Sequence, residues 1–386
     1  MVERSSDSGI LERPALGTDA GRQTEPQPHR SLADVPGPVT VAVTNYNGEA
    51  YLEDCLRSVR ALRGRVSDVI VIDNASTDDS VEVIQRHPVR LVQMHRNDGP
   101  CPARNRGLIE ASTKWVLQID SDVVLEPDLL EKLWPEREDT AVAIVQPRAV
   151  LAHDTDVVHY DGGRMHYVGV MCLDHLLERV EELPGEPEDI DAVISMALLV
   201  DRLAVLDVGG YDEAFFILFE DHDLSYRLRV RGRRLVRVPR ARVLHREGTE
   251  GISFRPGASA YPETRAFLHA RNRTYLVLKN YTWRALLLSL PGRWVYGTVW
   301  ALFALKRGVF GAYLRGRWEL LGLIPRALAQ RRRLRGQRRV GDRQLLLDDD
   351  LTFSPVIDRS RLEAGLERLL SGTLRIWWRL VRWLVP

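Results

Sequence analysis

Short apolar runs alternate with helical patterns in the first part of the chain. The runs at 39–47, 68–74, 89–96 and 114–122 are rich in Val, Ile and Leu, and each ends in polar residues. Apolar residues at helical spacing follow each of the first three runs, in "EAYLEDCLRSVRAL", "VEVIQRH" and "PARNRGLIEAS". Strands that alternate with helices predict a parallel sheet covered on both faces. The nearly continuous apolar strands agree, because parallel strands are buried on both sides.

Polar side chains collect where these four predicted strands end. Ligands of such sheets bind outside the carboxyl ends of the strands, so we expect one shared crevice. Asp120 and Asp122 form an Asp-x-Asp pair, which suits a hard cation with oxygen ligands. Turn chemistry is the alternative, since Asp is common where strands stop. The polar tips are Thr44, Asn45, Asp73, Asn74, Asn97, Asp98, Asp120 and Asp122.

Glycine-rich phosphate cradles are absent from the sequence. No G-x-G-x-x-G follows the first strand, and G-x-x-x-x-G-K-[ST] does not occur. A bound nucleoside diphosphate would therefore need another positive partner. A divalent metal held by carboxylates would serve.

A second acidic group lies in "GGYDEAFFILFEDHDLSYRLRVRG", residues 209–232. Glu220, Asp221 and Asp223 follow an apolar stretch and begin a helical pattern. Capping of free N–H groups explains one acid at a helix start. Three acids behind an apolar wall also fit a general base, because burial and like charge raise the proton affinity of a carboxylate. His245 ends a later strand-like run, and it is either structural or a metal ligand.

Charge divides the chain into two unlike parts. Residues 251–386 hold 25 Lys and Arg against 9 Asp and Glu, whereas residues 1–250 hold 29 against 44, so the net charge of +1 hides the split. This asymmetry predicts an acidic working domain and a basic region that meets an anionic surface. The alternative is that basic helices pack on the acidic domain. No nucleic-acid reading motif accompanies the arginines.

Three widely spaced cysteines favour neither a disulfide framework nor a zinc site, and fit a reducing, cytosolic setting. Residues 1–37 lack the apolar core of a secretory signal and read as a disordered leader.

Six motifs in order resemble those of the family 2 glycosyltransferases, inverting enzymes with the glycosyltransferase A fold. The similarity covers about residues 38–255 and is nearest to the rhamnosyltransferase- and galactofuranosyltransferase-like members that extend lipid-linked saccharides. The motifs are "VAVTNYNG" (41–48), "VIDNASTDDS" (71–80), "NDGPCPARNRGL" (97–108), "LQIDSD" (117–122), the acidic segment at 209–232 and "VLHREGTEGIS" (243–253).

This resemblance implies a role for each matching residue. Asp73 and Arg104 would contact the nucleotide base, in a pocket lined by Thr44 and Asn45, with Asn74 standing where many relatives have a second Asp. Asp120 would contact the ribose. Asp221 would be the general base, with Glu220 and Asp223 as candidate acceptor contacts. Asp122 and His245 would hold a divalent metal, Mg²⁺ or Mn²⁺, on the diphosphate.

The end of the chain is basic and rich in tryptophan. Its longest charge-free stretch with several Trp residues, "WVYGTVWALFAL" at 294–305, has 12 residues, against about 20 for a spanning helix. We predict helices in the interface of an anionic leaflet, with a re-entrant hairpin over 285–305 as the alternative. The tail "LRIWWRLVRWLVP" has Ile376, Leu380 and Trp383 on one helical side, which also fits a dimer contact or a core helix.

The hypothesis that follows is a metal-dependent inverting glycosyltransferase, peripheral at the cytoplasmic face of the cell membrane. It would move a sugar from a UDP or dTDP carrier to a lipid-linked saccharide in cell-surface polysaccharide synthesis. The alternatives are a polyprenyl phosphate acceptor, or a non-catalytic scaffold that binds a sugar nucleotide. The predicted architecture is a disordered leader (1–37), a mixed, mainly parallel α/β catalytic domain (38–255), a basic Trp-rich helical region (256–335) and a tail with an amphipathic helix (336–386).

Overall fold

A computed structural model describes residues 38–246, 261–353 and 361–386. The predicted leader and the end of the last motif, residues 247–253, lie outside these ranges, as does the predicted boundary at 255.

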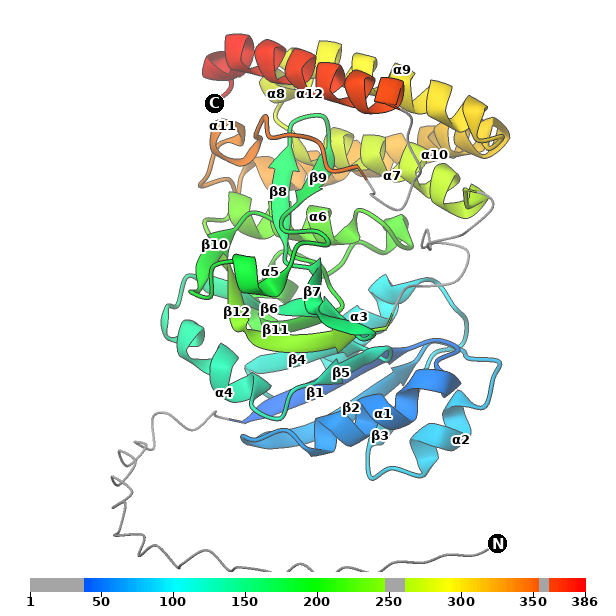
Figure 1. The fold of residues 1–386 in the computed structure, drawn as a ribbon, viewed down its shortest axis with the longest axis vertical. Coiled ribbons are helices and arrows are strands. Elements are labelled where there is room, and N and C mark those ends of the chain that lie inside the picture. The colour runs from blue at the N-terminus through cyan, green and yellow to red at the C-terminus, as the bar shows by residue number, and fades with distance from the viewer. Residues whose placement is uncertain (1–37, 247–260, 354–360) are drawn as a thin grey trace, which may run out of the picture.

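The first half of the central sheet consists of four parallel strands in the order β3-β2-β1-β4 (Figure 1). Three helices connect them, so the alternation predicted from the sequence is confirmed. The buried faces are built from the Val, Ile and Leu residues of the four apolar runs. The elements are β1 (Val39–Asn45), α1 (Glu49–Arg60), β2 (Val66–Asp73), α2 (Ser80–Gln85), β3 (Arg90–Gln93), α3 (Pro100–Glu110) and β4 (Trp115–Asp120).

The second half of the sheet is mixed. β11 (Ala197–Asp201) runs antiparallel to β4, while β6 (Val142–Leu151) and β12 (Arg234–His245) return to the direction of β1. Six of the ten strands in this described sheet therefore share one direction, which gives the mainly parallel α/β architecture that was predicted. The other elements here are β5 (Val123–Leu125), α4 (Leu129–Leu133), η2 (Trp134–Glu138), β7 (Asp154–Tyr160), η3 (Val180–Glu182), β10 (Glu188–Ile190), α5 (Arg202–Asp207), η4 (Glu213–Phe215) and α6 (Glu220–Val230).

Helices dominate the described residues after β12, and they stack in layers above the sheet (Figure 1). α6 lies nearest the sheet, α7 and α10 pack along each other above it, and α8, α9 and α12 form the outermost layer. No helix of the described ranges is long and apolar enough to cross a membrane. The elements are α7 (Glu263–Asn280), α8 (Trp283–Leu288), α9 (Leu290–Lys306), α10 (Phe310–Arg335), α11 (Asp342–Leu345), α12 (Arg361–Val381) and η5 (Arg382–Leu384).

A two-stranded hairpin joins the sheet to the outermost helices. It consists of β8 (Gly163–His166) and β9 (Val170–Leu173), and Tyr167 lies at its turn. The Tyr167 ring stacks on Trp378 of α12 with centroids 4.4 Å apart, and its hydroxyl donates to the Leu374 carbonyl at 2.9 Å. A Cβ on Gly292 of α9 would lie 2.2 Å from the Tyr167 hydroxyl. Only glycine fits there, so α9 and α12 both rest on this tyrosine.

Candidate active site

The carboxyl ends of β1, β2 and β4 bring the predicted nucleotide residues side by side. Asn45 is the register partner of Asp73, and Thr44 is the register partner of Asp120. The Thr44 carbonyl also accepts the Ser121 N–H at 3.0 Å. Parallel pairing therefore gathers side chains that lie up to 76 residues apart in sequence.

Asp73 is buried in a small hydrogen-bonded group. Its carboxylate accepts the Asn45 amide at 2.9 Å, the Ser76 hydroxyl at 2.6 Å and the Ser76 N–H at 3.1 Å. Asn74 donates to the Asn97 side chain and to the Gly99 carbonyl, which ties the end of β2 to the start of α3. The buried Oδ1 of Asn45 has no hydrogen-bond partner within the described residues and lies against Gly48, where an added Cβ would be only 2.1 Å away.

Arg104 connects the two acidic groups found in the sequence. From α3, its Nη2 lies 3.1 and 3.0 Å from the two carboxylate oxygens of Asp120, and its Nη1 lies 3.3 Å from Glu220 Oε1. The side chain is buried. Its guanidinium thus joins the strand-end acids to the start of α6, although Arg104 and Glu220 are 116 residues apart and no spacing rule links them.

Glu220 and Asp221 lie in the first turn of α6, behind the apolar stretch of the second motif. Glu220 Oε2 and Asp221 Oδ1 have no hydrogen-bond partner among the residues that the structure describes. Burial, and then the neighbouring Asp221, raise the pKa of Glu220 to about 8. Burial also raises the pKa of Asp221, against the opposing effects of Arg104 and of hydrogen bonds from Ser195. Two adjacent carboxyls that hold protons tightly are suited to proton transfer near neutral pH.

Asp122, just before β5, and His245, at the end of β12, lie side by side where these two strands pair. His245 Nε2 lies 3.3 Å from Asp122 Oδ2, because the antiparallel pairing places His245 opposite Val123. His245 Nδ1 lies 2.8 Å from Nδ1 of His159 on β7. Burial, and then the charge of His245, lower the pKa of His159 to about 3, so this ring is neutral and its Nδ1 accepts a hydrogen bond from the Nδ1–H of His245.

A metal ligand must be a neutral imidazole, and in neutral His245 a hydrogen bond from Nδ1–H to His159 would leave the Nε2 lone pair for an ion beside Asp122. Within the described residues, no group of three or more His, Cys, Asp or Glu is arranged to hold a metal ion. Two protein groups fit a cation whose other positions are filled by substrate oxygens. His159 was not predicted as a site residue, because nothing in the sequence relates it to His245.

Asp223 faces away from this crevice. Its carboxylate is fully buried and binds Lys279 Nζ at 2.8 Å, Arg227 at 2.7 Å and the Asn280 amide at 2.8 Å. Lys279 also binds Asp212 at 2.6 Å. The structure thus brings Asp223 to α7 and does not bring it beside Asp221, and we do not retain it as an acceptor contact.

The segment before Asp221 has an unusual backbone and is held by α7. Phe216, Leu218 and Phe219 all have positive φ, at 65°, 68° and 74°. Each such non-glycine residue costs about 1–3 kcal/mol and persists only where its surroundings enforce it. The Asn272 amide lies 2.9 Å from each of the carbonyl oxygens of Phe215, Ile217 and Leu218. Arg271 donates to the same Phe215 carbonyl and to one further carbonyl, that of Ala214.

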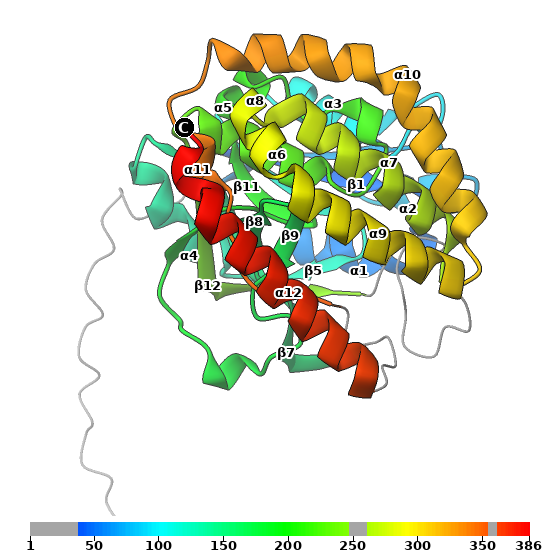
Figure 2. The same cartoon turned by 90° about the horizontal axis from the view of Figure 1, so that it is seen from above.

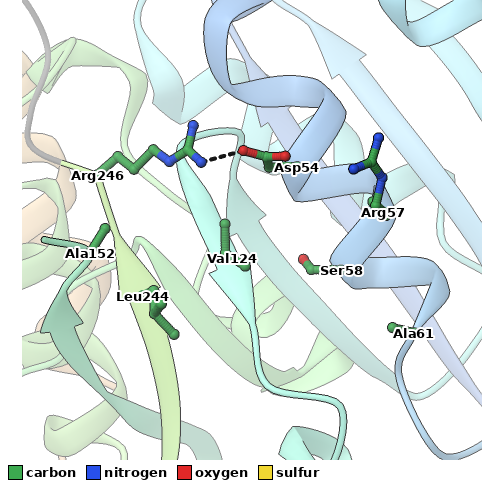
Figure 3. Close-up of a pocket in the computed structure, with 8 residues that line it drawn as sticks. All are labelled: Asp54, Arg57, Ser58, Ala61, Val124, Ala152, Leu244 and Arg246. Carbon is green, nitrogen blue, oxygen red and sulfur yellow. Dashed lines mark hydrogen bonds and ion pairs between the residues drawn. The ribbon is translucent and has the colours of Figure 1, made fainter. Parts of the chain in front are cut away.

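A pocket of about 390 Å³ lies beside the crevice, between α1 and the edges of β5 and β12 (Figure 3). Val124 and Leu244 form an apolar side, and an ion pair between Arg246 and Asp54 lies at one end. It contains none of the residues predicted to act on a donor or an acceptor. Leu244 and His245 are adjacent in β12 and alternate between faces, which explains why the pocket and the Asp122–His245 pair are neighbours but separate.

Comparison with known proteins agrees with this geometry. Residues 40–177 match the family model "Glycosyl transferase family 2". The matched residues run from β1 through the β8–β9 hairpin. In fold, the chain resembles the crystal structure of GalNAc-T7 with UDP, GalNAc and Mn²⁺, with a TM-score of 0.52 and 18% identity over 66% of this chain and 51% of that one. The fold is the glycosyltransferase A fold.

Two curated relatives are similar to slightly more than half of this chain. The poly-beta-1,6-N-acetyl-D-glucosamine synthase of Staphylococcus aureus (strain COL) is 25% identical over 211 residues, which cover 53% of this chain and 48% of that protein. The pre-mycofactocin glycosyltransferase of Mycobacterium tuberculosis (strain CDC 1551 / Oshkosh) is 32% identical over 216 residues, covering 55% and 43%. The chain therefore spans just under half the length of these relatives.

Proposed function

We propose that this protein transfers a sugar from a nucleoside diphosphate carrier to a hydroxyl of an acceptor, with inversion at the anomeric carbon. The proposal rests mainly on the two ion pairs that Arg104 makes, with Asp120 and with Glu220. They fix Asp120, at the donor end of the sheet, against Glu220, which is adjacent to Asp221. Donor and acceptor acids thereby share one crevice at the carboxyl ends of the strands.

The donor is assigned to the tips of β1 and β2. Asn45 and Asp73 supply acceptors for base N–H groups, and Thr44 supplies backbone contacts. Arg104 and Asp120 lie next to them, on the path from the base to the diphosphate. UDP and dTDP fit this assignment, because a carboxylate such as Asp73 suits the N3–H that uracil and thymine share.

Asp122 and His245 are the residues that would hold a divalent metal, Mg²⁺ or Mn²⁺. When bound, such an ion neutralises charge on the diphosphate as it leaves. Their convergence at 3.3 Å supports this assignment. His159 is assigned the positioning of the His245 ring through the bond between their Nδ1 atoms.

Asp221 is assigned the role of general base, which takes the proton of the acceptor hydroxyl. The acceptor oxygen attacks the anomeric carbon on the face opposite the diphosphate, its proton passes to the free Oδ1 of Asp221, and the C–O bond to the diphosphate breaks. One displacement across the ring inverts the centre, by the same geometric logic that places a single base across the ring in inverting hydrolases. Glu220, with its pKa raised to about 8, keeps its proton at neutral pH and leaves the negative charge on Asp221.

A lipid-linked saccharide at the cytoplasmic face of the cell membrane is the acceptor we propose. It agrees with the basic, Trp-rich end of the chain and with the resemblance to rhamnosyltransferase- and galactofuranosyltransferase-like enzymes. The synthase from S. aureus is named for a polysaccharide product. In this proposal, a catalytic domain and a membrane-associated helical region divide the chain near residue 255.

Thermal stability with and without Mn²⁺, across UDP-, dTDP- and GDP-sugars, tests the donor site. We expect Mn²⁺ together with a UDP- or dTDP-sugar to raise the melting temperature, since a ligand at a hundredfold excess over Kd stabilises by about 2.7 kcal/mol. Asp122→Asn should lose the metal-dependent part, whereas Asp128→Asn on α4, outside the crevice, should keep it. No rise with any nucleotide in folded protein would favour the scaffold alternative.

The variant Asn272→Ala tests whether α7 holds the 215–219 segment, and with it Asp221, in place. We expect kcat to fall about tenfold while KM for the donor stays unchanged, because a loosened 215–219 segment misplaces Asp221 but not the strand tips. Thr274→Ala, on the same helix and bonded to Arg317 instead, serves as the control. A rise in donor KM with unchanged kcat would contradict the proposed role.

A further inference from the structure

Exposed apolar side chains concentrate in the helices after β12. Of the 20 large apolar residues that are exposed in the described ranges, 16 follow residue 282. Single exposed apolar residues are normal on a protein surface, but contiguous sets mark an interaction site. Their arrangement on α9 and α12 is regular.

α12 has one row of apolar side chains that faces the protein interior and a second row that faces outward. Leu370, Leu374 and Trp378 are buried against the hairpin and α9. On the opposite face an uncharged stripe is exposed, at alternating steps of three and four residues. It consists of Leu366, Leu369, Thr373, Ile376, Leu380 and Trp383. Because helical neighbours lie three and four residues apart, these side chains form a continuous row.

α9 has the same construction. Its inner face carries Gly292 and Ala304, both buried. The outer face is again uncharged and consists of Leu290, Trp294, Thr298, Leu302 and Leu305. Trp294 is 71% exposed, which is unusual for an indole without a partner surface.

The two helices lie in one layer and run antiparallel. The Trp377 indole donates to the Leu288 carbonyl at 2.9 Å at one end, and Lys306 pairs with Glu363 at the other. Figures 1 and 2 show both helices on the side of the molecule farthest from the sheet. Since both inner faces rest on Tyr167, both uncharged stripes point outward and form one face, which we call the α9–α12 face.

The charge around this face decides between a bilayer and a second copy of the chain. Residues 283–307 and 361–386 contain nine Lys and Arg and two Glu. Arg284, Arg368 and Arg379 are exposed. Packing two such faces together would bring like charges into contact, whereas an anionic lipid surface attracts them. Trp and Arg beside apolar rows are typical of helices that lie in the headgroup region.

We propose that the α9–α12 face seats the protein flat in the interfacial layer of an anionic bilayer, with both helix axes parallel to the membrane. The outward face of α10, where Trp318 and Leu314 are also exposed, takes no part, because Figure 2 shows α10 at the side of the layer. This inference concerns binding alone and holds whichever sugar is transferred.

Co-sedimentation of the full chain with phosphatidylglycerol-containing vesicles, and with phosphatidylcholine vesicles, tests the proposal. The variant Leu302→Glu/Ile376→Glu puts one acid in each stripe, and both positions are exposed in the wild type, so folding is unaffected. We expect it to lower binding to the anionic vesicles at least about tenfold, because two apolar side chains no longer leave water. Leu314→Glu, an exposed leucine on α10, is the matched control and should change binding less than about twofold.

Three results would overturn the proposal: no binding to anionic vesicles, equal binding to neutral vesicles, or an equal loss in Leu314→Glu. A fourth result that would overturn the proposal can come from analytical ultracentrifugation without lipid. A dimer that the double variant dissociates, together with no vesicle binding, would assign the α9–α12 face to a second copy.

Discussion

Replacing Asp221 with Asn is expected to lower kcat for sugar transfer by about 10²- to 10⁴-fold, the usual contribution of a general base. The change keeps the size of the side chain and its contact with Ser195 but removes the lone pair that takes the acceptor proton. Donor binding should be unchanged, since the proposed donor contacts lie on β1, β2, β4 and α3. Transfer assays with the donor that stabilises the protein, together with its Kd, measure the two effects separately.

Glu220→Gln is the matched control, one residue away in the same turn. Glutamine imitates the protonated carboxyl, which is the form that a pKa of about 8 gives Glu220 at neutral pH. We therefore expect kcat at pH 7 to stay within about tenfold of the wild type. Full activity in Asp221→Asn, or an equal loss in both variants, would remove Asp221 from the role of base.

The same control predicts a change in stability with pH. The folded state binds the Glu220 proton more tightly than the unfolded chain, whose carboxyl has the ordinary pKa of 4.5. This contribution to stability is fully present below pH 4.5 and is lost as the pH rises to about 8. Glu220→Gln should flatten that decline in the free energy of unfolding, which urea titrations at several pH values would measure.

Lys279→Met is expected to destabilise the fold by about 3–5 kcal/mol, the cost of breaking a buried ion pair from one side. Lys279 is almost fully buried and lies between Asp212 and Asp223. Without it, two buried carboxylates keep their charge with fewer partners. Because Asp223 is in α6 and Lys279 is in α7, the loss also loosens the contact between the sheet and the helices above it.

Lys306→Met provides the comparison on an exposed pair. Lys306 is 62% exposed and binds Glu363, so its loss should cost at most about 1 kcal/mol. A Lys279→Met variant as stable as Lys306→Met would show that the buried group contributes no net stability.

The deficit of Lys279→Met should shrink in acid. Burial opposes ionisation of Asp212 and Asp223, but Lys279 and arginine neighbours more than offset it, so both pKa values lie below the ordinary 3.8 in the native protein. Their contribution to stability is present above pH 3.8 and is lost as the pH falls through the lowered values. Denaturant titrations of both variants at pH 7 and at several pH values below 3.8 would show the convergence.

The sequence predicted the elements whose pattern is local. The four apolar runs and the helices between them are visible from spacing alone, and parallel pairing then places Asn45, Asp73 and Asp120 at one edge. The roles of Asp221 and His245 stay predictions, which follow from the resemblance of their motifs to those of the family 2 glycosyltransferases.

Contacts between distant segments had no such signal. The Arg104–Glu220 bond, the His159 beside His245 and the three carbonyls gathered by Asn272 depend on how separate elements pack. Asp223 illustrates the opposite error. Two residues after Asp221 it seemed part of the same acidic group, but that spacing turns a helical side chain about 200° away, toward α7.

The position of Tyr167 at the hairpin turn also determines which segment packs last during synthesis of the protein. Tyr167 is synthesised long before Trp378 and Leu374, the side chains that cover it. During translation the earlier segments fold first, so Tyr167 stays without its contacts to α12 until the chain has grown by the 207 residues to Leu374. The α9–α12 face therefore exists only once α12 has packed onto the hairpin.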